Sequence, residues 1–118
     1  MERKPAQSFR DLVVWQKAHQ LVLSIYRITK NFPKDEMGLT SQVRRSSSSV
    51  AANIAEAFKK KSSLDKLRIL NIAQGSLSET EYHILLADDL NYGEVNLIQE
   101  NAKEVSRLLE SYMKAIRK

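Results

Sequence analysis

The stretch from Gln42 to Glu56 constrains the fold of this chain most strongly, because it has the periodicity of one helix with three different faces. The apolar face, with Leu39 above it and Phe58 below it, is expected to lie in a core and consists of Val43, Val50, Ile54 and Ala57. The second face carries very small side chains that allow another helix to approach closely: Ser48, Ala51, Ala52 and Ala55. The third face is a polar edge made of Arg45, Ser49, Asn53 and Glu56. Because a helix with two packable faces needs more than one neighbour, we expect the small face to form an oligomer contact.

Helical periodicity recurs along the rest of the chain and predicts helices at residues 9–31, 38–61, 63–90 and 94–116. Pro33 cannot continue a helix, and Gly93 suits the left-handed position that ends one. Ser8 and Ser62 each precede an aspartate by three residues, as in a capping box that opens a helix. The predicted fold is all-α, an up-down-up-down antiparallel four-helix bundle. Residues 1–8 are expected to form a flexible tail, and residues 9–118 a single domain.

The first and third predicted helices carry further information about packing. The main apolar stripe of the first helix is expected at Leu12, Trp15, Ala18, Val22, Ile25 and Phe32. The third helix is apolar on two sides, which predicts burial on both, and Gly75 in its middle favours close packing. Glu81 projects into one of these stripes and therefore needs a partner or water. Asp88 and Asp89 sit at the negative end of the helix dipole, where a cation from this chain or a neighbour would offset them.

The residues that support most kinds of catalysis are missing. The chain has no cysteine, and neither His19 nor His83 follows a glutamate by three residues, as a di-iron bundle site requires. The serine run at residues 46–49 has no strained turn around it and is better explained as a helix contact. We therefore expect no enzyme activity, metal or cofactor. The short apolar runs and the charged N-terminus predict a cytoplasmic protein without a membrane segment.

The net charge of +5 is unevenly distributed, with +4 on residues 1–33, +3 on 34–61, −3 on 62–91 and +1 on 92–118. A basic half can bind nucleic acid, attract an acidic helix of another subunit, or simply keep the protein dissolved. The candidate phosphate-binding residues are Arg44, Arg45, Lys59, Lys60, Lys61, Lys66 and Arg68, with Arg3, Lys4 and Arg10 near the N-terminus. Three cations at a helix end also complement its dipole, so Lys59, Lys60 and Lys61 have a structural explanation too.

Several blocks of the sequence resemble the four-helix-bundle proteins of the 23S rRNA intervening-sequence family. The resemblance covers roughly residues 9–93 and rests on residues 9–18, Tyr26, Phe32-Pro33, Glu36, Gly38-Leu39, residues 41–45, Ser49-Val50, residues 53–56, residues 73–77 and Glu79. Its most specific parts are Arg44-Arg45, Asn53-Ile54-Ala55-Glu56 and Gly75-Ser76, in this order. The chain departs from the family at Ala57, where glycine is usual, and alanine should stiffen that helical turn.

The resemblance implies a bacterial bundle that assembles into a homopentameric ring and has no catalytic activity. Open reading frames of the family lie within intervening sequences of large-subunit rRNA genes. A similar bundle is the accessory protein of retroelement reverse transcriptases, where a basic ring is thought to bind nucleic acid. The molecular function of the family is largely unassigned, so the resemblance constrains the fold more than the function.

These observations favour a non-enzymatic homo-oligomer that binds RNA or DNA non-specifically through its clustered Lys and Arg side chains. The alternative is an oligomeric scaffold for a protein partner, whose basic charge serves assembly and solubility. No small-molecule substrate is expected. We expect a structural polar network rather than a ligand site at Arg45, Asn53, Glu56 and Glu79.

Overall fold

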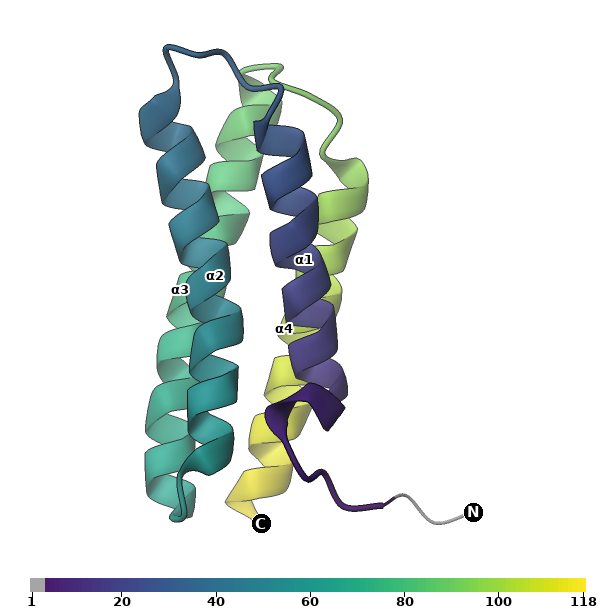
Figure 1. Cartoon of the computed structure of the whole chain (residues 1–118), viewed down its shortest axis with the longest axis vertical. Coiled ribbons are helices and arrows are strands. Elements are labelled where there is room, and N and C mark those ends of the chain that lie inside the picture. The colour runs from purple at the N-terminus through teal and green to yellow at the C-terminus, as the bar shows by residue number, and fades with distance from the viewer. Residues whose placement is uncertain (1–3) are drawn as a thin grey trace.

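The computed structural model describes residues 4–118, which form four long α-helices and no strand. The elements are the 3-10 helix η1 (Phe9–Asp11) and the helices α1 (Val13–Thr29), α2 (Met37–Lys59), α3 (Ser63–Asp89) and α4 (Asn96–Arg117). Figure 1 shows the four helices side by side along the long axis of the molecule, whose extents are 46 × 30 × 19 Å. The contacts run α1–α2, α2–α3, α3–α4 and α4–α1. The expected all-α class is confirmed.

The helix connections divide the bundle into two ends (Figure 1). The α1–α2 and α3–α4 links lie together at one end, which we call the loop end. The α2–α3 link, η1 and the C-terminus lie at the other end, which we call the terminal end. Residues that are far apart in the sequence therefore meet at each end.

The first helix begins later than its capping residues predict. Ser8 and Asp11 do form a capping box, in which the Asp11 carboxylate accepts from the Ser8 N–H at 3.2 Å. It caps only η1, because Leu12 is extended (φ −79°, ψ 124°) and α1 starts at Val13. This break folds Phe9 back onto Trp15, with the ring centroids 4.9 Å apart in an edge-to-face arrangement.

The core face of α1 is rotated from the predicted stripe. Val14 and Leu21, which lie outside the predicted main stripe, are buried, whereas Trp15 and Val22 of that stripe are half-buried. The reason is that α1 contacts both α2 and α4, so the buried face points between these two neighbours.

The end of α3 also differs from the prediction, because Asn91 rather than Gly93 takes the left-handed position. Asn91 has φ 61°, the Tyr92 N–H donates to the Ala87 carbonyl at 2.9 Å, and the Asn91 N–H donates to the Asp88 carbonyl at 3.0 Å. These two bonds form a Schellman cap. Gly93 (φ 154°) lies beyond the cap and passes Ile28, where a Cβ atom would come within 3.3 Å of the Ile28 side chain.

The contact between α2 and α3 is built from small polar side chains that lie in the serine run and opposite it. Ser46, Ser47 and Thr80 are fully buried. The Thr80 hydroxyl donates to the Ser46 hydroxyl at 2.8 Å, and Ser49 and Ser76 share a hydrogen bond of 3.0 Å. The interpretation of the serine run as a helix contact is confirmed. We call this contact the α2–α3 seam.

The burial of α3 on two sides, which the sequence predicts, is found on only one side within the described chain. Leu70, Ala73, Leu77 and Ile84 are buried, but Ile72 on the opposite side is exposed. Gly75, expected to allow close packing, is exposed and has no atom within 4 Å of the place where a Cβ would lie.

We predict that Ser46→Leu destabilises the fold by about 1–3 kcal/mol, because the larger side chain overpacks the α2–α3 seam. The measurement is the free energy of unfolding from urea titration. Ser106→Leu is the matched control, since Ser106 lies on the exposed side of α4. Equal stabilities for the two variants would contradict the close packing of the seam.

Candidate nucleic-acid interface

Three of the predicted phosphate-binding residues lie together at the terminal end. Lys59 is the last residue of α2, Lys60 is its C-cap with an extended backbone (ψ 145°), and Lys61 lies in the link to α3. The helix ends two residues earlier than the sequence predicts, so Lys61 is not part of its last turn. Lys59 and Lys61 are exposed, and Lys60 is half-buried.

Lys66 lies at the same end but is already engaged by the protein. Its ammonium donates to the carbonyls of Ala57 at 3.2 Å and Phe58 at 2.9 Å, and it lies 5.5 Å from the centre of the Phe58 ring. It therefore satisfies the Phe58 carbonyl at the end of α2 and adds a second bond to the Ala57 carbonyl, which also accepts from the Lys60 N–H at 3.1 Å. Arg68 is exposed, with its Nε 3.8 Å from the Asp65 carboxylate, and stays available to an anion.

The fold adds cations to this end that sequence reasoning missed. The C-terminus lies beside the α2–α3 link in Figure 1, which brings Lys114, Arg117 and Lys118 to the terminal end. Lys4 and Arg10 arrive there with the N-terminal segment and η1. Arg3 lies outside the described residues. The alternating direction of the four helices was the signal that could have placed the C-terminal cations here.

Arg44 does not lie in this group. It is 15 positions before Lys59 in α2, which is about 22 Å along the helix axis. Its Nε donates to the Thr29 hydroxyl at 2.8 Å, and its guanidinium lies 4.6 Å from the centre of the Tyr26 ring. Arg44 therefore ties α1 to α2.

The residues of the expected polar network fall into separate groups. Arg45 donates to Glu79 at 3.0 Å, and the same carboxylate lies 3.2 Å from His83. The Asn53 amide instead donates to the Ser49 carbonyl at 2.8 Å. Glu56 is exposed and forms no ion pair among the described residues.

A groove between α1 and α2 near the loop end, of about 770 Å³, was not anticipated from the sequence. We call it the α1–α2 groove. It is lined by Tyr26, Thr29, Lys30, Phe32, Pro33, Lys34, Met37, Thr40, Ser41, Arg44, Arg45 and Ser48. The lining combines apolar and aromatic side chains with four cations and contains no carboxylate. Its residues come from two helices and their link, and no single sequence pattern joins them.

The predicted small-residue face continues from this groove along α2. Ser48 belongs to both surfaces and is half-buried, Ala52 is exposed, and Ala55 is half-buried. Ala51 instead contributes to the core. The outer part of this face is thus uncovered within one chain.

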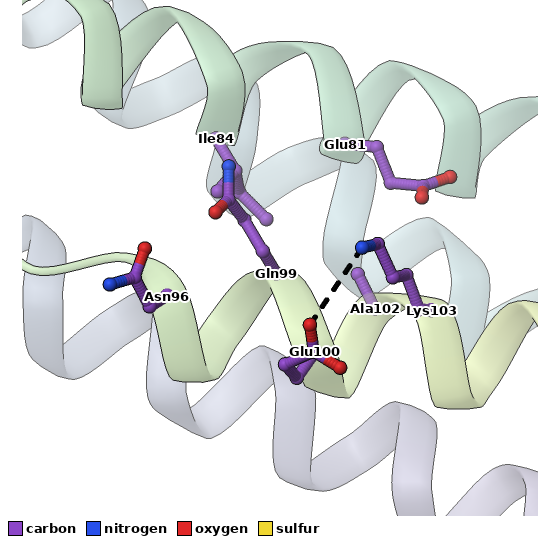
Figure 2. Close-up of a pocket in the computed structure, with 7 residues that line it drawn as sticks. All are labelled: Glu81, Ile84, Asn96, Gln99, Glu100, Ala102 and Lys103. Carbon is purple, nitrogen blue, oxygen red and sulfur yellow. Dashed lines mark ion pairs between the residues drawn. The ribbon is translucent and has the colours of Figure 1, made fainter.

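A second hollow, of about 330 Å³, lies between α3 and α4. Figure 2 shows Glu81 on α3 above Lys103 and Glu100 on α4, with Lys103 paired to Glu100 at 3.7 Å. Burial raises the pKa of the Glu81 carboxyl above its ordinary value, and the Lys103 charge partly offsets this effect. The described residues contain no group of three His, Cys, Asp or Glu side chains that could hold a metal ion.

We predict that Glu81→Gln stabilises the protein at neutral pH by less than about 1 kcal/mol, since the site is partly exposed. A raised pKa in the folded state means that protonated Glu81 is favoured by folding, and this contribution is lost as the pH rises through the folded pKa. The gain from Gln should therefore disappear below about pH 4. Melting temperatures of the wild type and the variant from pH 3 to 8 measure this gain in stability. A gain that grows toward low pH would contradict the prediction.

Comparison with known proteins identifies the family. The model of the 23S rRNA-intervening sequence protein family matches residues 10–111. The chain belongs to this family. A search of curated proteins gives no match.

One solved relative has the same fold. It is a crystal structure of a protein with unknown function from the S23 ribosomal protein family of Bacteroides thetaiotaomicron. It superposes with a TM-score of 0.79 at 30% sequence identity, over 86% of this chain and 96% of the relative. No described helix of the present chain is long and apolar enough to cross a membrane.

Proposed function

We propose that this member of the 23S rRNA-intervening sequence protein family is a non-enzymatic module that binds RNA or DNA without sequence specificity. The observation that supports the proposal is the gathering of cations at the terminal end. Residues from the N-terminal segment, the α2–α3 link and the end of α4 contribute to it. The exposed cations at this end are Lys4, Arg10, Lys59, Lys61, Arg68, Lys114, Arg117 and Lys118.

The chemistry of this surface suits phosphates rather than bases. Flexible lysines release counterions from a nucleic-acid backbone, and such binding is independent of sequence. The large exposed aromatic side chains of the described region, Tyr26 and Tyr82, belong to helices α1 and α3 and not to the α2–α3 link. A base-stacking platform is therefore not part of the proposed site.

Assembly completes the proposal. The up-down-up-down bundle forms a ring-shaped homo-oligomer, with five copies as the resemblance implies. A ring presents several basic ends to one polymer, and this raises the apparent affinity without any new kind of contact. Arg44 and Arg45, which the sequence suggested as phosphate-binding residues, are left out of the proposed site because neighbouring side chains hold both guanidinium groups.

We predict that replacing Lys59, Lys60 and Lys61 together by Gln weakens binding to a short RNA and lowers the slope of log K against log salt by about 2–3. Fluorescence anisotropy at a series of salt concentrations gives this slope. The matched control replaces three other cations by Gln: Lys17, Lys103 and Arg107. These lie on α1 and α4, away from the α2–α3 link.

The expected result is that the control triple variant keeps most of the slope. Equal losses from both variants would remove the α2–α3 link from the proposed site. A wild-type protein that fails to bind RNA or DNA at about 50 mM salt would reject nucleic-acid binding. That result would favour a scaffold that binds a protein partner.

A further inference from the structure

The outward side of α3 is an apolar surface that no residue of 4–118 covers. Ile72, Tyr82 and Leu85 are 49%, 58% and 48% exposed, and Gly75 between them is open to solvent. Their spacing places them along one side of a helix. Asp89 lies on the same side at the loop end, and Asp88 is the exposed residue before it in the last turn. We call these six residues the α3 outer face.

The negative charge of the α3 outer face is not compensated by any ion pair among the described residues. No Lys or Arg occurs between Arg68 and Lys103. Asp88 and Asp89 lie in the last turn of α3, where the helix dipole makes a carboxylate unfavourable, and neither forms an ion pair with any residue of 4–118. A cation from outside the chain would stabilise them.

The α1–α2 groove has the complementary composition. Lys30 and Lys34 in its lining form no ion pair within the described chain, and Met37 in the same lining is 75% exposed. Ser48 in its lining and the exposed Ala52, one turn further along α2, have small side chains that let another helix come close.

The two surfaces lie at the same level along the bundle. The Ser46–Thr80 and Ser49–Ser76 hydrogen bonds fix the register of the antiparallel helices α2 and α3. In this register, residues of α2 and α3 whose numbers sum to about 126 lie at the same height along the bundle axis. Asp89 is therefore level with Met37, Tyr82 with Arg44, and Gly75 with Ala51. Thus the acidic end of the α3 outer face is level with the basic groove, and its glycine is level with the small side chains of α2.

From this match we infer that the α1–α2 groove receives the α3 outer face of a second copy of this chain. A rotation about an axis parallel to the long axis of the bundle keeps every residue at its level, so each copy offers the acidic face to one neighbour and the groove to the other. Asp88 and Asp89 of one copy then pair with Lys30 and Lys34 of the next. Such a heterologous contact closes into a ring.

The inference deepens the proposed function, since it rests on the homo-oligomer and names the surfaces that form it. It also gives the assembly a polarity, because the same rotation places every terminal end on one side of the ring. The contact lies toward the loop end and on the sides of the bundle, so it leaves Lys59 and Lys61 exposed.

Cysteine cross-linking tests the contact directly, because the natural chain contains no cysteine. One preparation carries Gly75→Cys and another carries Ala52→Cys. After mixing, subunit exchange and mild oxidation, we expect a covalent dimer on a denaturing gel only when both variants are present. Ser106→Cys, on the exposed side of α4, replaces either partner as the control and should give no dimer. A dimer from Gly75→Cys alone would overturn the inference, since it would place two α3 helices against each other.

Charge reversal provides the second test and does not depend on disulfide geometry. Asp88→Lys with Asp89→Lys, and separately Lys30→Glu with Lys34→Glu, should each shift the light-scattering mass from the oligomer to the monomer at about 0.1 M salt. Combining all four changes in one chain should restore the oligomer. Circular dichroism checks that each variant is folded, and Glu100→Lys with Arg107→Glu on α4 is the control. An oligomer unaffected by either pair of reversals would overturn the inference.

The outcomes separate this inference from the proposed function. If the Lys59, Lys60 and Lys61 variant remains an oligomer but the wild type does not bind RNA, nucleic-acid binding fails and the contact stands. If the protein binds RNA but is a monomer at every concentration tested, the contact fails and the phosphate-binding end stands.

Discussion

The buried hydrogen bond between Thr80 and Ser46 lies at the centre of this fold. Hydroxyls of this size let α2 and α3 approach closely, and each finds a partner, so burial leaves neither unsatisfied. The α2–α3 seam sets the register of the two helices. That register places the polar pair Arg45–Glu79 at the edge of the seam and brings Asp89 level with Met37. A shift of one helical turn between α2 and α3 would separate the surfaces that we assign to assembly.

The direction of the helices determines where the charge lies. Each link reverses the chain. The basic α2–α3 link therefore lies at the same end of the bundle as the two termini, while the acidic end of α3 lies at the same end as the α1–α2 link (Figure 1). The basic block around the α2–α3 link and the acidic block at the end of α3 therefore lie at opposite ends of the folded bundle. The two kinds of surface can then serve different partners, a polyanion at one end and another copy along the sides.

Sequence reasoning could predict the helices because their apolar periodicity and stop signals are local. Ser62 caps α3 as expected, accepting from the Asp65 N–H at 3.1 Å. The break at Leu12 was missed because it depends on the packing of Phe9 against Trp15, a tertiary contact. The role of Arg44 was also missed, since its partners Thr29 and Tyr26 lie on another helix. Likewise, the C-terminal cations join the terminal end only through the topology.

Lys66 couples the stability of the last turn of α2 to the binding of an anion at the terminal end. Its ammonium donates to the carbonyls of Ala57 and Phe58, and it lies beside the cations that we propose bind a polyanion. A phosphate that attracts this ammonium competes with the two carbonyls, so binding would loosen the last turn of the helix that presents Lys59. The backbone amides of that turn would then exchange with deuterated water faster in the complex than in the free protein. Amide exchange in the last turn of α2 would therefore indicate whether an anion is bound beside Lys66.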